Sequence, residues 1–373
     1  MAEESGKIRI GITHGDFNGV GYEVIIKSLA HRDICELFTP VIFGSAALAS
    51  KTAAMLKADD FKFVQIESTA DIQDGKINLV DVVGADVKQT PGTPSREAGL
   101  AAVKALEAAS EAIEEGDIDL LVTAPIDKKS VHGDDFKFPG HTEYLEDRFV
   151  VEGGKALMIM ADERLKVALV TTHLPLSEVP GHITKENVVR AIKDFNMALK
   201  MDFGFERPKI AVLSLNPHCG DGGVLGNEEI EFIKPAIEAC SGEGILAFGP
   251  LAADGLFGSG AYLNYDGVLA MYHDQGLAPF KALARAAGVN FTAGLDIIRT
   301  SPGHGTAYDR AGRGVADETS MKEAIYMAVD IARRRATYLD ASENPLEIHE
   351  IKPRDNKRRS KEENVAPQEE DKE

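Results

Sequence analysis

Short apolar runs alternate along the chain with longer segments in which apolar residues recur at helical spacing. Several short runs are continuously apolar, which is typical of strands covered on both faces by helices. Strands separated by helices predict βαβ units and a mostly parallel sheet, so we expect an α/β fold. The expected strands are Ile8–Thr13, Pro40–Phe43, Ile77–Val83, Leu120–Thr123, Val167–Thr172, Ile210–Leu215, Val268–Tyr272 and Val289–Thr292. The expected helices include Glu97–Glu115, Lys185–Met201, Glu228–Cys240 and Ser320–Tyr338.

The alternating pattern ends near Glu343. The segment from there to Glu373 holds few apolar residues and many charges of both signs. Such a segment buries too little apolar surface to offset the entropy of ordering, so residues 343–373 are expected to form a polar, disordered tail. The rest of the 373 residues is long enough for two domains.

Charge and cysteine content narrow the function. The formal net charge is -19 and the pI about 5.0, which argues against a nucleic-acid or anionic-membrane partner. A small anionic substrate stays open, because a local pocket of Lys and Arg can form on an acidic protein. The three scattered cysteines predict no disulfide framework. Neither a signal peptide nor an apolar run of about 18–20 residues is seen, so a cytoplasmic location is expected.

Histidines follow three of the expected strands. His173 follows KVALVTT, His218 follows KIAVLSLNP and His273 follows GVLAMY. The carboxyl ends of parallel strands share one edge of a sheet, where ligands bind, so these residues are expected to converge. Imidazole is a common zinc ligand, and three protein ligands with an open position are typical of a catalytic metal site. Singly, each is more often an ordinary polar residue; Asp274 either orients an imidazole or caps the next helix.

Other polar residues fit the same site. The break at FPGHTEY exposes His141 and Thr142, although this threonine can also open a helix. Lys281, Asn290 and Arg299 are donors suited to phosphate or carboxylate, although each alone would more often be a surface residue. The glycine-rich segment NPHCGDGG can present backbone N–H groups to an anion, but it is not a GxGxxG motif and is weak evidence.

Six motifs occur in a fixed order between Ile8 and Tyr338. They are GHTE (Gly140–Glu143), TTHLPL (Thr171–Leu176), LNPHCGDGG (Leu215–Gly223), MYHDQG (Met271–Gly276), IRTSPGHGTA (Ile298–Ala307) and AGRG (Ala311–Gly314). This set closely resembles the 4-hydroxythreonine-4-phosphate dehydrogenase family of vitamin B6 biosynthesis. The resemblance implies two α/β/α domains around a central cleft, as in isopropylmalate dehydrogenase. It implies a first domain at approximately 1–130 plus 300–342 and a second, with the metal site, at 131–299. Members are homodimers with the active site at the interface and metal ligands from both subunits.

The resemblance also assigns roles to residues. It implies a divalent metal ion held by His173, His218 and His273; zinc is the expected ion, with magnesium, cobalt and manganese as alternatives. It implies substrate contacts at His141, Thr142, Lys281, Asn290 and Arg299, of which His141 and Lys281 are the catalytic candidates. The cofactor, NAD or NADP, would contact His304, Gly305, Thr306 and Ala307, and the sequence does not fix which of the two is preferred.

The implied activity is oxidation of 4-phosphohydroxy-L-threonine to 2-amino-3-oxo-4-(phosphooxy)butanoate. This product decarboxylates to 3-amino-2-oxopropyl phosphate on the route to pyridoxal 5'-phosphate. The chain departs from the family pattern at four loops: THGDFNGVGYE lacks two prolines, Asp127 stands where Asn or His is usual, AADG replaces PADT, and Gly303 replaces an acid. The departures keep 4-phospho-D-threonate or 4-phospho-D-erythronate dehydrogenase open as an alternative.

Two alternatives come from other classes. A three-histidine metal hydrolase would place a hydroxide in the open metal position. A non-catalytic binder of phosphorylated metabolites would need no metal triad. The HGTA and AGRG segments resemble a nicotinamide-cofactor loop and therefore favour the dehydrogenase.

Overall fold

The computed structural model describes residues 7–31, 33–133, 136–151 and 153–344. Contacts divide the chain into one unit, Met1–Tyr338, and a second, Leu339–Glu373. The predicted polar tail, residues 343–373, lies almost wholly outside the described residues. Among the described residues, no helix is long and apolar enough to cross a membrane.

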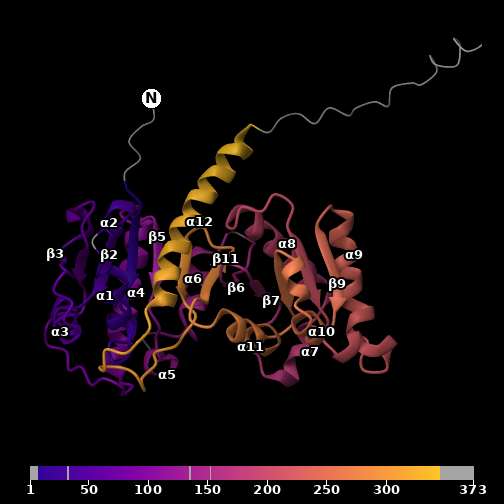
Figure 1. Ribbon diagram of the computed structural model, residues 1–373, viewed down its shortest axis with the longest axis horizontal. Helices are drawn as coiled ribbons and strands as arrows, with labels where there is room; N and C mark the ends of the chain where they lie inside the picture. Colours follow the sequence, from indigo (N-terminus) through magenta and orange to yellow (C-terminus); the bar gives the residue numbers. More distant parts are fainter. Residues whose placement is uncertain (1–6, 32, 134–135, 152, 345–373) are drawn as a thin grey trace, which may run out of the picture. The chain divides into compact units, whose positions relative to one another are not determined.

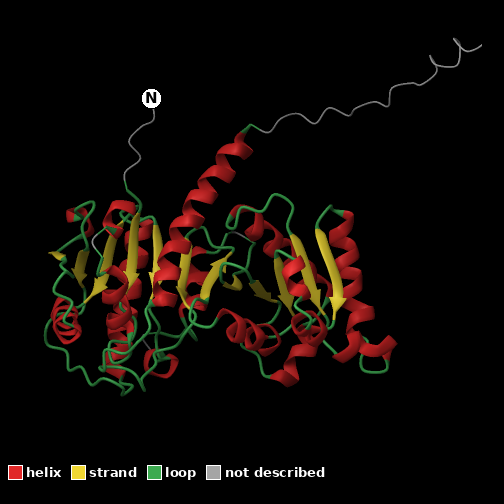
Figure 2. Cartoon of the chain, viewed as in Figure 1, coloured by secondary structure: helices red, strands yellow, loops and turns green. Residues whose placement is uncertain are grey.

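A twelve-stranded sheet runs through the first unit in the order β3-β4-β2-β1-β5-β12-β11-β6-β7-β10-β8-β9 (Figure 2). Most neighbouring strands are parallel, as expected, but β12–β11, β11–β6 and β6–β7 are antiparallel. The strands are β1 Arg9–Thr13, β2 Thr39–Gly44, β3 Val64–Ile66, β4 Asn78–Asp81, β5 Leu120–Thr123, β6 Leu157–Ala161, β7 Lys166–Leu169, β8 Lys209–Leu213, β9 Leu246–Leu251, β10 Gly267–Ala270, β11 Val289–Ala293 and β12 Ile298–Pro302.

Helices flank the sheet (Figure 1). The α-helices are α1 Gly21–Leu29, α2 Ile34–Leu37, α3 Ala46–Leu56, α4 Arg96–Glu114, α5 Lys128–Val131, α6 His141–Phe149, α7 Val179–His182, α8 Lys185–Met201, α9 Lys234–Gly242, α10 Ala253–Gly258, α11 His273–Ala284 and α12 Thr319–Glu343. Short 3-10 or π turns are η1 Thr69–Asp71, η2 Leu176–Glu178, η3 Pro217–Gly223, η4 Glu229–Ile233 and η5 Ala261–Asn264.

The α/β class and all eight predicted strands are confirmed, and so are the four predicted helices. β5 and α8 have the predicted bounds, whereas β7, β8 and β10 end two or three residues earlier than predicted. The sequence analysis missed β3, β6, β9 and β12. β5 and β10 are buried along their whole length, as their continuous apolar runs predict.

The strand order places β1–β5 and β12 on one side of the sheet and β6–β11 on the other. The antiparallel pair β11–β12 joins the two sides. The predicted division into two domains, at approximately 130 and 300, stays a prediction.

For the site, the important neighbours are β7, β10 and β8, which are parallel and adjacent. Each of these three strands is followed by one of the predicted metal-ligand histidines.

Candidate active site

A cavity of about 310 Å³ brings together most of the predicted site residues. It lies where β5, β11 and β12 meet the loops and helices that follow β5, β7 and β10; Figure 1 shows α5 and α11 along the same lower edge of the sheet. We call it the substrate cavity. Its wall includes all five predicted substrate residues and two of the three predicted metal ligands: His141, Thr142, Lys281, Asn290, Arg299, His173 and His273.

His173 and His273 face one another across this cavity. Their ring centroids are 6.0 Å apart. Glu143 Oε1 lies 3.5 Å from Nδ1 of His173, and Asp274 Oδ1 lies 2.7 Å from Nδ1 of His273. A carboxylate beside Nδ1 favours the proton on that nitrogen and leaves Nε2 as the free ligand atom. Of the two roles expected for Asp274, its contact with the imidazole is the one seen.

His218 lies elsewhere in the same chain. It lines a second cavity of about 440 Å³, together with Asp254 and Tyr272. The η3 loop turns through consecutive residues of positive φ, among them His218 at 52° and Cys219 at 54°, and thereby directs the histidine into this cavity. Buried Glu229 accepts hydrogen bonds from the two backbone N–H groups that lead into the loop. Within the described part of one chain, no group of three His, Cys, Asp or Glu residues is positioned to hold a metal ion.

Arg299 is a buried cation whose hydrogen-bond partners among the described residues are hydroxyl groups. Its side chain is 2% exposed, and its Nε and Nη2 both donate to Oγ1 of Thr123, at 3.1 and 2.7 Å. Nη1 donates to Oγ1 of Thr292 at 3.1 Å. Burial lowers the pKa of Arg299 to about 10, so the guanidinium stays charged at neutral pH. Two N–H groups, one on each terminal nitrogen, are left for an anion in the cavity.

His141 is the first residue of α6 and is uncharged at neutral pH. Desolvation lowers its pKa well below the ordinary histidine value, and the charges of Arg299 and Lys128 lower it further. Asn290 Oδ1 is buried in the same cavity wall without a hydrogen-bond partner among the described residues. A neutral imidazole and an unpaired amide oxygen are therefore both available to a bound molecule.

Two charged residues of the substrate cavity received no role in the sequence analysis, Lys128 and Glu143. Lys128 follows the carboxyl end of β5 by five residues. The rule that singled out the three histidines, a polar side chain just after a buried strand, would have found it. Glu143 follows His141 by two residues, and no signal other than its place in GHTE pointed to it.

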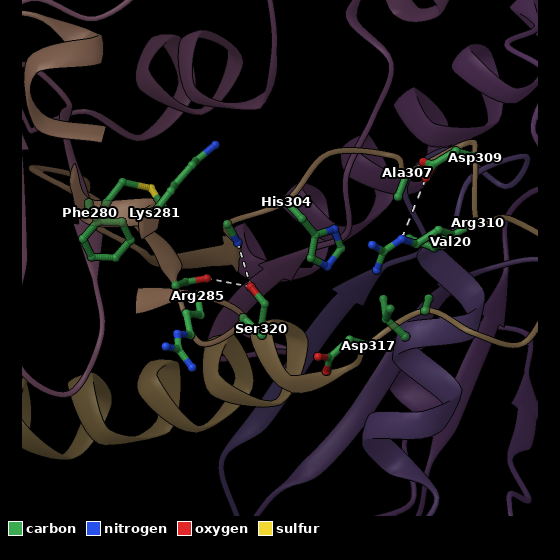
Figure 3. A pocket seen from close by; sticks show the side chains of 16 residues that line it. Val20, Phe280, Lys281, Arg285, His304, Ala307, Asp309, Arg310, Asp317 and Ser320 are labelled. Atoms are coloured by element: carbon green, nitrogen blue, oxygen red, sulfur yellow. Dashed lines mark hydrogen bonds and ion pairs between the residues drawn. The ribbon is translucent and has the colours of Figure 1, made fainter. Parts of the chain in front are cut away.

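A larger cavity of about 520 Å³ adjoins the first (Figure 3). We call it the cofactor cavity. The two cavities share wall residues, among them Lys281 and His304. In Figure 3 the ring of His304 lies between Ser320 and Ala307, and its Nε2 is buried without a partner among the described residues. A molecule in either cavity therefore lies next to His304.

The segment His304–Ala307 is fixed by the loop that follows β1. His304 and Ala307 line the cofactor cavity, whereas Gly305 lines the substrate cavity. The carbonyl oxygen of Thr306 accepts a hydrogen bond from Val20 N at 3.0 Å. A Cβ at Gly19 would lie only 2.7 Å from that carbonyl oxygen, so a glycine is required for this approach.

Comparison with known proteins identifies one family. Residues 36–328 match the family "Pyridoxal phosphate biosynthetic protein PdxA". A 4-hydroxythreonine-4-phosphate dehydrogenase of Bacteroides thetaiotaomicron is 50% identical over 353 residues, which cover 94% of this chain and 96% of that protein. A D-threonate 4-phosphate dehydrogenase of Cupriavidus necator is 40% identical over 331 residues, with coverage of 88% and 98%.

A solved structure agrees with these sequences. The crystal structure of 4-hydroxythreonine-4-phosphate dehydrogenase from Klebsiella pneumoniae is similar to this chain with a TM-score of 0.75 and 34% identity. The match covers 88% of this chain and 99% of that one. The similarity therefore extends over the strands and loops that form both cavities.

Proposed function

Because this chain belongs to the pyridoxal phosphate biosynthetic protein PdxA family, we propose that it catalyses the reaction of 4-hydroxythreonine-4-phosphate dehydrogenases. The C3 hydroxyl of 4-phosphohydroxy-L-threonine would be oxidised to a ketone, with NAD⁺ or NADP⁺ as the hydride acceptor. The product, 2-amino-3-oxo-4-(phosphooxy)butanoate, is a β-keto acid. Its carboxylate leaves as CO2 to give 3-amino-2-oxopropyl phosphate.

The observation that carries the proposal is the pair of adjoining cavities. The substrate cavity is lined by three cations, Lys128, Lys281 and Arg299, and by one carboxylate, Glu143. This excess of positive charge suits a substrate with a phosphate and a carboxylate, on a chain whose net charge is -19. The shared wall, which includes His304, would bring the substrate carbon next to a bound cofactor, as hydride transfer requires.

The donor set of the site fits a divalent ion. His173 and His273 each have a carboxylate at Nδ1, which orients Nε2 as the ligand atom. We propose that these two residues hold the ion together with His218 of a second copy of the chain, because His218 lines a separate cavity within its own chain. Zinc, magnesium, cobalt and manganese all accept such ligands. When bound, the ion would supply Lewis-acid chemistry and lower the pKa of the substrate hydroxyl.

The residues of the chain would then bind the substrate and handle its proton. Arg299 and Lys281 would hold its anionic groups, and Asn290 would accept a hydrogen bond at Oδ1. His141 is unprotonated at neutral pH, so one of its ring nitrogens can take the hydroxyl proton as hydride leaves C3. Lys281 lines both cavities, and its ammonium group is the second candidate for proton transfer at the shared wall.

The cofactor cavity suits a nicotinamide dinucleotide. Buried His304 Nε2 lacks a partner, and the segment that carries it is fixed by the loop after β1. We propose that His304–Ala307 contact NAD or NADP there. A metal hydrolase would have no use for the cofactor cavity, which favours the dehydrogenase over the three-histidine hydrolase.

We further propose a homodimer in which each active site uses residues of both copies. The homodimer is favoured because His218 lines a different cavity from His173 and His273 of the same chain. The enzyme is expected to act in the cytoplasm.

A second candidate substrate is D-threonate 4-phosphate, because a relative that is 40% identical is named D-threonate 4-phosphate dehydrogenase. It has a hydroxyl at C2 where 4-phosphohydroxy-L-threonine has an amino group. The discriminating experiment measures kcat/KM for both substrates with NAD⁺ and NADP⁺, in the presence of each candidate ion and after chelation. Turnover of 4-phosphohydroxy-L-threonine at least about tenfold above the other supports the proposal. The reverse order assigns the chain to the D-threonate activity, and phosphate release without cofactor reduction supports a hydrolase.

The metal assignment has a separate readout. Calorimetric titration of the metal-free protein with zinc should show tight binding in the wild type and loss of that binding in His273→Ala. Unchanged zinc binding in this variant would contradict the proposed ligand set.

A further inference from the structure

Lys128 lines the substrate cavity, and the reaction proposed above gives it no role. It is the first residue of α5 and lies close to Gly140, where a Cβ would be 3.6 Å from its Cε. Within the described ranges, its ammonium group forms no ion pair within 4.0 Å, although its charge lowers the pKa of the neighbouring Glu143 carboxyl. A lysine on a cavity wall without such a partner is available to an anion.

The backbone of Lys128 is held at both ends of its short helix. Asp127 caps the helix by accepting hydrogen bonds from the backbone N–H and the hydroxyl of Ser130, at 2.9 and 2.6 Å. Arg96 Nη1 donates to the carbonyl oxygens of Ser130 and Val131 at the other end. A Cβ at Gly99 would overlap the carbonyl oxygen of Ser130, so α4 packs directly on α5. Asp127, one of the departures from the family pattern, thus has a structural use as a helix cap.

The positive charges of Lys128 and Arg299 both influence His141 in the wall of the substrate cavity. Both charges lower the pKa of His141, which places the imidazole within electrostatic reach of each of them. Lys281, the third cation, also lines the cofactor cavity. The cations therefore divide into a pair around His141, on α5 and β12, and one cation on α11 beside the cofactor cavity.

We propose that Lys128 and Arg299 form the binding subsite for the substrate's phosphate group. A dianion matches two cations, whereas the single cation Lys281 matches a carboxylate. The two remaining N–H groups of Arg299 suit two phosphate oxygens, and the lysine supplies a compact charge that reaches a third. This inference rests on the proposed function for the identity of the substrate.

The test compares Lys128→Ala, Lys128→Arg and the matched control Lys129→Ala. Lys129 is the next residue on the same helix, is also exposed, and lines neither cavity. Each variant is assayed with 4-phosphohydroxy-L-threonine and with 4-hydroxy-L-threonine, which lacks the phosphate. The KM for the nicotinamide cofactor and the affinity for zinc are measured in parallel.

We expect Lys128→Ala to raise the KM for the phosphorylated substrate by about tenfold to a hundredfold, in line with the loss of a hydrogen bond between charged groups. Lys128→Arg should recover part of this loss, and Lys129→Ala should resemble the wild type. Cofactor KM, zinc affinity and turnover of the unphosphorylated substrate should stay unchanged in all three. An equal loss with both substrates would overturn the phosphate assignment and point to the carboxylate. An unchanged KM in Lys128→Ala would overturn any role in anion binding.

A binding measurement separates this inference from the proposed function. Inorganic phosphate is titrated into the wild type and the three variants by calorimetry. If the wild type oxidises neither candidate substrate, the proposed function fails, but weaker phosphate binding in Lys128→Ala alone still supports the subsite. Equal phosphate binding in all four proteins would overturn the subsite whatever the substrate proves to be.

Discussion

Thr123 holds the buried guanidinium of Arg299 through two hydrogen bonds, whereas Thr292 accepts one. Thr123→Val keeps the shape of the side chain but leaves two buried donors unpaired. We expect the KM for the phosphorylated substrate to rise by about tenfold and the free energy of unfolding to fall by about 1–3 kcal/mol. Steady-state kinetics and urea unfolding measure the two effects.

Thr292→Val is the matched control, because it removes one hydrogen bond to the same cation. It should change both quantities in the same direction and by less. A Thr123→Val enzyme with wild-type KM and stability would show that the guanidinium does not depend on this hydroxyl for its position.

His14 is fully buried at the carboxyl end of β1 and stacks on Tyr22, with ring centroids 5.2 Å apart. Burial lowers the pKa of His14 to about 4, against about 6.5 in the unfolded chain. The unfolded state therefore binds a proton first as the pH falls. Stability is unaffected by this group above pH 6.5 and is lost progressively between about pH 6.5 and pH 4.

The pH dependence can be measured against His14→Leu, which has no ionisable group at this position. Between pH 7 and pH 5, the free energy of unfolding should fall by about 2 kcal/mol more in the wild type than in the variant. Urea unfolding at the two pH values gives both numbers. Parallel pH dependence in the two proteins would mean that His14 titrates normally in the folded state.

At the level of single residues, the sequence analysis identified side chains that lie together but not all of their partners. His173 and His273 could be named because each follows a buried apolar run. The two carboxylates beside these histidines differ in whether the sequence alone could reveal them. Asp274 is adjacent in sequence and was considered, whereas Glu143 reaches His173 only through the tertiary fold.

The loop after β1 and the segment after β12 are joined by a side-chain hydrogen bond. The hydroxyl of Tyr308 donates to Oδ2 of Asp16 at 2.8 Å. Burial raises the pKa of Asp16, and the bond from Tyr308 opposes this rise. The contact helps to fix the segment His304–Ala307 against Val20, at the wall of the cofactor cavity.

Tyr308→Phe should loosen this segment without touching the substrate cavity. We expect the dissociation constant of the nicotinamide cofactor to rise by about fivefold, the effect of losing one hydrogen bond of about 1 kcal/mol. The KM for the phosphorylated substrate should not change. Fluorescence titration with the reduced cofactor measures the first quantity, and a variant with unaltered cofactor affinity would argue against this role of the loop.

Among the elements, two of the strands that the sequence did not predict, β6 and β9, have few β-branched residues. β6 reads LMIMA and β9 reads LAFGPL, so neither has the enrichment that marks a strand. β12 reads IRTSP, and its arginine and proline suggest a loop. It is a central strand because Thr123 and Thr292 satisfy the buried guanidinium, a tertiary effect that no local pattern reports.

For the whole molecule, the mostly parallel sheet was predictable from the sequence, but the antiparallel strands at its centre were not. The antiparallel pair β11–β12 connects the two sides of the sheet and brings Asn290 and Arg299 into the wall of one cavity. A pattern of apolar runs does not distinguish the direction of a strand, so this joint was not predictable. The position of His218 was not predictable for a similar reason. The sequence shows that His218 follows β8, but it does not show that a left-handed loop directs this histidine into a separate cavity.

In the proposed dimer, one dehydrogenase site combines His173 and His273 of one copy with His218 of another. The most direct test co-expresses two differently tagged variants and purifies the mixed dimers. A dimer of His218→Ala with His273→Ala retains one intact site and should oxidise 4-phosphohydroxy-L-threonine at about half the wild-type rate. A dimer of His173→Ala with His273→Ala has none and should be inactive. Equal activity in the two mixed dimers, or no activity in either beside an active wild type, would contradict the account.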